Sequence, residues 1–310
     1  MIRCNMRSAI AAIAMAVSTL SGAIRETFAA DVLYVTMSDN TVRKFDTAGN
    51  SLGIFANDGM NDPRGLAFDP SGNLYVANYA TNTLAKFNSS GSYLPAETIA
   101  LGLNFSVGVA IDQAGDIYVS NESSSRIRKF DSAGNQLATS IAGNTPTALA
   151  FDSAGFLRVA NRTGNTIAKY DTDLNAVAGT ISTDLNRPRG LAFDASGNIY
   201  AANGFTDDIS KFSSSGTFLG RIGSSTNLNN PYGLAFDSQG YLYVASEQSR
   251  TIAKFASNGD FVTSWSTGSI APRFIAFETT TVPEPGTLAL GAVAVAVAVL
   301  AKRRSRKRLI

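Results

Sequence analysis

One stretch of sequence returns at an almost constant interval along the chain. Copies of the pattern that reads Gly-Leu-Ala-Phe-Asp in the first case begin at Gly65, Gly108, Ala148, Gly190 and Gly233, so the steps are 43, 40, 42 and 43 residues. A fixed period in this range is typical of a repeat architecture. Each copy is therefore expected to form one structural unit of the same kind.

Each unit is predicted to consist of strands. In the first copy, the apolar run 65–69 is followed by the turn sequence Asp-Pro-Ser-Gly-Asn and by a second apolar run at 74–78. Gly72 can supply the positive φ that this turn requires. A third strand is expected at 83–88, and a more variable fourth strand near 93–100. The turn glycine recurs as Gly115, Gly155, Gly197 and Gly240.

The first two strands of each unit are apolar at nearly every position, so both of their faces must be covered. Four-stranded sheets packed face to face around an axis, with the first strand innermost, meet this requirement. The predicted fold class is all-β, a six-bladed β-propeller of four-stranded antiparallel blades. Five copies give five blades, and both chain ends build the sixth, with Phe274–Glu278 beside Leu33–Thr36. Such closure pairs edges that an open sheet would expose.

The unit resembles the NHL repeat in its Gly-apolar-Ala-apolar-Asp start, its glycine turn, its Tyr-Val-Ala-polar strand and its Asn-x-Ile-x-x-Phe strand. The resemblance covers Asp31 to about Thr281. The family often has aspartate after the Val-Ala pair, where this chain has Asn78, Asn121, Asn161, Asn203 and Ser246. The resemblance implies a propeller but no particular activity, because propellers include lyases, lactonases and plain binding modules.

Residues 1–30 differ in composition from the repeats. They begin with Arg3 and Arg7, continue with an apolar run at 9–20, and reach small residues at Ala29 and Ala30. This order predicts a signal peptide that directs export. The propeller is expected to occupy 31–281 as a single domain.

The C-terminal segment, 282–310, has three parts. The sequence Pro283-Glu284-Pro285 comes before an apolar run at 288–301, and a basic end follows. Basic residues after an apolar run indicate that this end stays cytoplasmic. The segment resembles the PEP-CTERM sorting signal. That resemblance implies a transient inner-membrane anchor through 288–301, removal by an exosortase-like protease, and a mature protein at the cell surface or outside the cell, with an exopolysaccharide or a protein as ligand.

Composition restricts the chemistry. The chain has no histidine, and its one cysteine, Cys4, lies in the predicted signal peptide. The absence of histidine argues against zinc sites and histidine acid–base catalysis of the kind used by streptogramin-lyase-like propellers. Residues 31–281 hold 17 basic and 22 acidic side chains, since nine basic and two acidic ones lie in the terminal segments. Nucleic acid is therefore not an expected partner.

The predicted binding surface is one face of the propeller. The loops before the first strands, called lead-in loops here, should emerge on the same face as the loops after the second strands. Together they carry a polar, aromatic and cationic mixture that favours ligand binding, although proline that sets a loop and asparagine that tolerates a bend would also explain it. The candidate ligand-binding residues are Arg64, Asn78, Asn121, Glu122, Asn161, Arg189, Asn203, Tyr232, Glu247 and Arg273.

Two charged series recur in the repeats. An aspartate ends each first strand and is expected to cap the turn, and a lysine in each third strand is expected to lay its stem on apolar surface rather than form a basic ring for anions. Some of the lysines should meet these aspartates, in the pairs Asp69–Lys86, Asp112–Lys129, Asp152–Lys169, Asp194–Lys211 and Asp237–Lys254.

No serine, aspartate or cysteine stands in a motif with a catalytic base. We therefore expect a non-catalytic binding module with no cofactor and no metal. The alternative is a calcium-dependent hydrolase or lactonase, because Glu, Asn and Asp are suitable calcium ligands. Only Glu122 and Glu247 are expected at the binding face, and they lie too far apart across the axis to share one ion directly.

Overall fold

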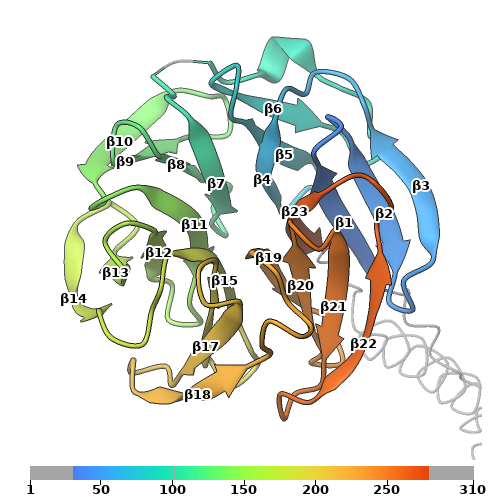
Figure 1. The fold of residues 1–310 in the computed structure, drawn as a ribbon. Helices are drawn as coiled ribbons and strands as arrows, with labels where there is room; N and C mark the ends of the chain where they lie inside the picture. Colours follow the sequence, from blue (N-terminus) through green and yellow to red (C-terminus); the bar gives the residue numbers. More distant parts are fainter. Residues whose placement is uncertain (1–30, 101, 279–310) are drawn as a thin grey trace, which may run out of the picture. The chain divides into compact units, whose positions relative to one another are not determined.

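The computed structural model describes residues 31–100 and 102–278. These residues form six antiparallel sheets arranged around a central axis (Figure 1). Five of the sheets have four strands and one has three. The prediction of an all-β, six-bladed propeller is confirmed.

In each blade the strands follow one another from the axis to the rim, and each blade is named here after its innermost strand. The first three blades are β4 (Pro63–Phe68), β5 (Leu74–Asn78) and β6 (Thr83–Phe87); β7 (Ser106–Ile111), β8 (Ile117–Asn121), β9 (Arg126–Phe130) and β10 (Gln136–Ile141); and β11 (Pro146–Phe151), β12 (Leu157–Asn161), β13 (Thr166–Tyr170) and β14 (Ala176–Ile181). The next two are β15 (Pro188–Phe193), β16 (Ile199–Asn203), β17 (Asp208–Phe212) and β18 (Phe218–Ile222); and β19 (Pro231–Phe236), β20 (Leu242–Ser246), β21 (Thr251–Phe255) and β22 (Phe261–Ser266).

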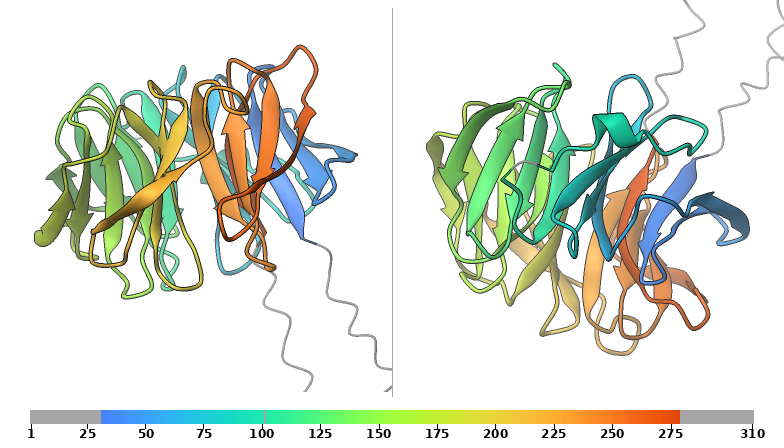
Figure 2. Two further views of the ribbon diagram at one scale, coloured as in Figure 1. Left: turned by 60° about the horizontal axis from the view of Figure 1, so that its bottom comes forward. Right: turned by 90° about the horizontal axis from the view of Figure 1, so that it is seen from above.

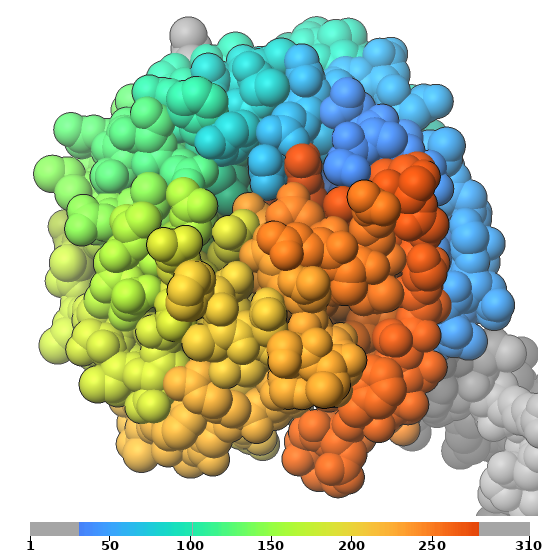
Figure 3. Space-filling view, viewed as in Figure 1, coloured from blue at the N-terminus to red at the C-terminus, as the bar shows by residue number. Residues whose placement is uncertain are grey.

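The sixth blade joins the two ends of the described chain. Its inner strand is β23 (Pro272–Phe277), which pairs antiparallel with β1 (Val32–Met37) in the register Leu33 to Phe277. β2 (Val42–Asp46) and β3 (Ser51–Ala56) complete the sheet. The orange end and the blue start therefore lie side by side (Figure 3). Figure 2 shows both described ends, residues 31 and 278, on one side of the propeller. The predicted closing blade is confirmed.

The β4 blade differs from the others at its rim. A 3-10 helix at Pro95–Glu97 interrupts the predicted fourth strand, and the strand pairing of this segment with β6 is limited to the isolated bridges Leu84 to Ile99 and Phe87 to Tyr93. Proline has no backbone N–H to donate to a sheet ladder. Pro95 therefore explains why the segment around it does not continue as a strand.

Buried tyrosines link the second strands to the turns. Tyr118 is fully buried, and its hydroxyl donates to the carboxylate of Asp112 at 3.0 Å and to the carbonyl of Thr172 at 2.8 Å. Burial, with the nearby Asp112 charge, raises the pKa of Tyr118 to about 12, although Lys129 acts in the opposite direction. The phenol therefore stays protonated near neutral pH. Tyr75, Tyr200 and Tyr243 occupy equivalent buried positions.

The aspartate caps are confirmed. The Asp69 carboxylate accepts the backbone N–H groups of Ser71 at 2.9 Å and Asn73 at 2.8 Å, which closes the turn between β4 and β5. The corresponding bonds are present at Asp112, Asp152, Asp194 and Asp237. We call the side of the propeller that carries these turns the turn face.

The expected pairs between these aspartates and the third-strand lysines form in only two blades. Lys211 lies 4.0 Å from Asp194, and Lys254 lies 3.8 Å from Asp237. Some of the pairs therefore form, as predicted, and the other three do not. Lys86 instead pairs with Glu97 at 2.7 Å, Lys129 with Asp116 at 2.8 Å, and Lys169 lies over the Phe156 ring. Closer carboxylates compete for Lys86 and Lys129. In the third blade the Asp152 carboxylate forms an ion pair with Arg158 instead of Lys169.

Glycines in the first strands allow these strands to pack closely around the axis. A Cβ atom on Gly190 would lie 1.9 Å from the carbonyl oxygen of Tyr232 in the next blade, and one on Gly108 would lie 2.1 Å from that of Thr147. Neither glycine has a positive φ, so close approach rather than backbone conformation requires it. The remaining axial cavity has a volume of about 60 Å³ and is lined mainly by apolar first-strand residues.

Candidate ligand-binding face

The lead-in loops and the loops after the second strands meet on one face, which we call the lead-in face. The backbone N–H of Tyr79, just after β5, donates to the carbonyl of Asp62, just before β4, at 3.2 Å. Glu122 bonds in the same way to Phe105 at 3.0 Å, and Arg162 to Thr145 at 2.9 Å. The predicted meeting of the two loop sets on one face is therefore present. Each bond fixes the first residue after a second strand beside the axis.

The residue that precedes the first strand adopts a left-handed conformation in five of the blades. Its φ is 53° at Asp62, 51° at Phe105, 55° at Thr145 and 52° at both Arg187 and Asn230. This conformation is uncommon for residues other than glycine, asparagine and aspartate. Side chains of the preceding blade support it, since Asn82 accepts the Phe105 N–H at 2.6 Å. Equivalent bonds join Asn40 to Asp62, Asn165 to Arg187 and Asp207 to Asn230.

The four predicted asparagines do not reach the surface. Asn78, Asn121, Asn161 and Asn203 are all 2% exposed or less. Asn78 accepts the Asn61 N–H at 3.0 Å and donates to the Gly59 carbonyl at 2.9 Å, while Asn121 and Asn203 accept the N–H groups of Asn104 and Asn186. At these four positions the structural interpretation is therefore the better one, because the amides are buried. Those of Asn78, Asn121 and Asn203 hold the lead-in loops, and that of Asn161 donates to Thr166.

The second residue of each first strand contributes to a ring around the axis. In blade order this ring reads Arg64, Val107, Thr147, Arg189, Tyr232 and Arg273. Its cationic and aromatic members are consecutive, whereas valine and threonine occupy the other arc. A cavity of about 130 Å³ opens here, lined by Arg64, Tyr79, Val107, Glu122, Thr147, Arg162 and Tyr232.

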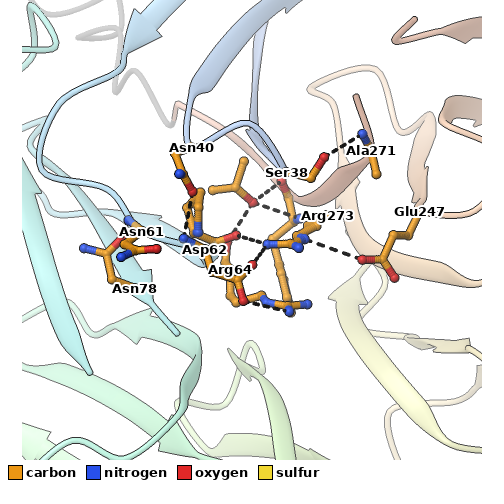
Figure 4. Close-up of polar contacts among 12 residues, drawn as sticks. Ser38, Asn40, Asn61, Asp62, Arg64, Asn78, Glu247, Ala271 and Arg273 are labelled. Carbon is orange, nitrogen blue, oxygen red and sulfur yellow. Dashed lines mark hydrogen bonds and ion pairs between the residues drawn. The ribbon is translucent and has the colours of Figure 1, made fainter. Parts of the chain in front are cut away.

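Arg64 and Arg273 share one aspartate at this site (Figure 4). Arg64 lies 3.1 Å from the Asp62 carboxylate and donates to the Tyr232 hydroxyl at 3.2 Å, and its guanidinium lies 4.9 Å from the Tyr79 ring centre. Arg273 pairs with Asp62 and lies 3.5 Å from Glu247. Both side chains are largely buried, so these contacts tie the closing blade to its neighbours.

The two predicted glutamates have partners within the protein. Glu122 forms an ion pair with Arg162, and Glu247 accepts from the Asn230 amide at 2.9 Å in addition to its contact with Arg273. Burial, followed by the negative charge of Glu122, raises the pKa of Tyr79, so this phenol is a hydrogen-bond donor at neutral pH. Within residues 31–100 and 102–278, no group of Asp, Glu, Cys or His side chains is arranged to hold a metal ion.

Arg189 differs from the other arginines of the ring. Its guanidinium stacks 4.4 Å from the Tyr232 ring centre and packs against Gly204. Among the described residues, no carboxylate lies within ion-pair distance of Arg189. The buried Nε atoms of Arg64, Arg162, Arg189 and Arg273 also have no hydrogen-bond partner there. The lead-in face therefore holds unused donors beside the cavity.

Three residues that build this site were not among the candidate ligand-binding residues. Tyr79 and Arg162 occupy the position after the second strand that Glu122 and Glu247 occupy in other blades, so alignment of the copies already places them on this face. No sequence pattern indicates a role for Asp62, because that role depends on arginines from two blades. Two exposed aromatic side chains were also omitted, Phe105 beside Tyr79 and Phe205 beside Arg187.

Comparison with known families agrees with the fold and with the C-terminal motif. Residues 60–87 match the NHL repeat, and residues 281–307 match the PEP-CTERM protein-sorting motif. The protein is therefore an NHL-type six-bladed β-propeller that carries a PEP-CTERM motif. A search of the curated proteins found no match.

Solved structures share the fold at low sequence identity. A chain of the nidogen/laminin complex is 16% identical with a TM-score of 0.70, and the match covers 80% of this chain and 98% of that one. A catalytically inactive virginiamycin B lyase from Staphylococcus aureus with quinupristin is 14% identical with a TM-score of 0.62, covering 81% and 93%. A protein of unknown function from Bacteroides caccae is 12% identical, with a TM-score of 0.62, covering 81% and 100%. At these identities the likeness concerns the fold alone.

The PEP-CTERM motif implies export, anchoring through the C-terminus and processing by exosortase, a membrane protease. Among the described residues, no helix is long and apolar enough to cross a membrane. The predicted signal peptide at 1–30 and the apolar run at 288–301 lie outside the described residues.

Proposed function

We propose that this protein is an exported, non-catalytic binding module whose ligand surface is the lead-in face. The observation that carries the proposal is the asymmetric ring at the axis, where Arg189, Tyr232, Arg273 and Arg64 are consecutive beside a polar cavity. Arg64 is hydrogen-bonded to Tyr232, Arg273 is paired with Asp62, and Arg189 has no carboxylate partner among the described residues. Preorganised, unused donors around a concavity are typical of ligand sites.

The turn face has a larger pocket, but the charged side chains of that pocket already have partners within the protein. That pocket, of about 640 Å³, lies between the β7 and β11 blades. Its acidic groups are engaged, since Asp112 caps a turn and accepts from Tyr118, Asp116 pairs with Lys129, and Asp152 pairs with Arg158. We therefore prefer the lead-in face.

A metal-dependent hydrolase or lactonase is the alternative function. The carboxylates nearest the cavity, Glu122 and Glu247, would have to leave Arg162, Arg273 and Asn230 to bind an ion. The lyases of this fold do not strengthen the alternative, because the inactive enzyme in complex with quinupristin lacks a histidine that its catalysis needs, and this chain contains none. The donor set at the site therefore favours binding over hydrolysis.

Ligand capture can be tested by face-specific substitution. We expect the full chain, incubated with the extracellular material of the producing cells, to retain one component by pull-down. Phe205→Ser, which removes an exposed aromatic side chain from the lead-in face, should reduce that capture several-fold. Gln113→Ala, in the turn-face pocket, should leave the capture unchanged. Loss of capture with Gln113→Ala alone would move the site to the turn face. No capture by any form would contradict the binding function.

We also propose that the chain remains anchored through 288–301 until processing at the Pro283-Glu284-Pro285 motif releases the propeller. The mature surface form should then lack the basic end, and Glu284→Ala should retain it because the recognised motif has changed. Intact-protein mass spectrometry of the envelope fraction measures both. A mature wild-type form that still contains Arg304–Ile310 would contradict processing.

A further inference from the structure

We propose that Arg189, together with Tyr232, binds the carboxylate of an acidic sugar unit, such as a uronic acid, at the centre of the lead-in face. This proposal rests on the proposed function and names the chemistry of its ligand. The charge balance of the site, its hydrogen-bond donors and its exposed aromatic side chains favour such a ligand.

One arginine of the ring has no carboxylate to neutralise it. Arg64 and Arg273 share Asp62, Arg273 also contacts Glu247, and Arg162 pairs with Glu122. Of the three arginines in the ring, only Arg189 has no carboxylate partner among the described residues. A planar guanidinium can hold a carboxylate through two parallel hydrogen bonds. The site therefore suits a ligand that brings one negative charge.

Two tyrosines of the lead-in face can donate to the oxygen atoms of such a ligand. The Tyr232 hydroxyl accepts from Arg64 at 3.2 Å, so its own proton remains available for a ligand oxygen. The Tyr79 phenol is protonated at neutral pH and lines the same cavity. A ligand that carries hydroxyl groups as well as a carboxylate can accept hydrogen bonds from both tyrosine hydroxyls. A simple anion would leave these tyrosine hydroxyls without a partner.

Two exposed aromatic rings lie on the lead-in face. Phe105 is 40% exposed and rests against Tyr79 at a ring separation of 4.7 Å, and Phe205 is 64% exposed with Arg187 at 5.1 Å from its centre. Each ring is held on one side and open on the other, and large rigid rings of this kind supply contact area at low entropic cost.

The same observations disfavour an acidic peptide as ligand. A run of carboxylates would need several unpaired arginines at the axis, whereas the ring has one such arginine, Arg189. The cavity of about 130 Å³ is polar and small, so it offers no apolar anchor pocket for a peptide side chain. A mostly neutral, hydroxyl-rich chain with one acid group in each unit fits better.

Calorimetric titration of the full-length chain in detergent micelles tests the proposal. The probes are a galacturonic acid trisaccharide and a neutral galactose trisaccharide. We expect the acidic probe to bind at least about tenfold more tightly, in line with the strength of charge-assisted hydrogen bonds, and to weaken as salt is added. Arg189→Gln should reduce affinity for the acidic probe about tenfold, and Arg189→Lys should restore part of it as a point charge.

Arg221→Gln is the matched control, because it removes the same charge from the outer strand of the same blade. It should leave affinity unchanged. Both Arg189 variants should share the melting temperature of the wild type, whereas Arg221→Gln also removes the ion pairs of Arg221 with Asp184 and Asp208 and should lower it slightly. Equal binding of both probes that is unaffected by Arg189→Gln would overturn the acid subsite but preserve a binding face. Arg189-dependent binding of a glutamate-rich peptide without sugar binding would replace the sugar by a protein ligand. Failure of every probe, together with no captured component in the pull-down, would overturn both proposals.

Discussion

A chain that ends at Ala271, before β23, is expected to lose cooperative folding. β23 supplies one of the two antiparallel partners of β1, and it buries Phe274 and Ile275 against the axis. Without it, β1 becomes an open edge next to an apolar gap. We expect a loss of more than about 4 kcal/mol in the free energy of unfolding, or aggregation, because a complete inner strand is missing.

The control is a chain that ends at Glu278, which lacks the C-terminal segment but keeps β23. Trp265, the one tryptophan, lies against Gly49 of the closing blade and so reports on this seam by fluorescence. Urea titration followed by that signal should show one transition for the chain that ends at Glu278 and none for the shorter one. A soluble, cooperatively unfolding chain that ends at Ala271 would disprove closure by β23.

Gly190→Ala is expected to destabilise the propeller and to disturb the site together. The added Cβ atom would lie 1.9 Å from the Tyr232 carbonyl, so the first strands of two blades must separate. Overpacking of this kind costs about 1–3 kcal/mol. The displaced residue, Tyr232, carries the stacked Arg189, so affinity at the lead-in face should fall as well. Chemical denaturation and ligand titration measure the two effects.

Gly164→Ala is the matched control, since the added Cβ atom would lie 3.4 Å from its nearest neighbour, which is ordinary contact. This change should be neutral or slightly stabilising, because alanine restricts the unfolded chain. The β11 blade already has Ala148 at the position equivalent to Gly190. If Gly190→Ala proves as harmless as Gly164→Ala, the inner strands adjust freely and close approach does not explain the glycine.

The repeat was sufficient to predict most of the fold. The recurring Asp and Gly of the turn predicted the caps, and the split copy at Phe274 predicted the closing blade. The role of Gly190 was not predicted, because a glycine needed for close packing looks the same in sequence as one needed for a positive φ. The interruption at Pro95 was also missed, because a variable region gave no pattern to compare.

The site was predictable in position but not in detail. The ring order followed from the period, which placed Arg64, Arg189 and Tyr232 near the axis. The asparagines after the second strands look equally polar in sequence whether their amides face solvent or a loop backbone. Ion pairing could not be predicted either, since the partners of Arg273 come from other blades. Arg189 therefore emerged as the unneutralised cation only from the three-dimensional arrangement.

The pairing of β1 with β23 also fixes the order in which the protein can fold. The Tyr34 hydroxyl donates to Glu278, which lies 244 residues later in the sequence. β1, the first of the described strands, can therefore complete its pairing only after β23, the last of them, has been synthesised. Contacts between such distant segments form slowly. Glu278 lies five residues before Pro283. The ring therefore cannot close until the chain directly before the sorting motif is available, so the closing strand and the sorting motif are neighbours on one short stretch of chain.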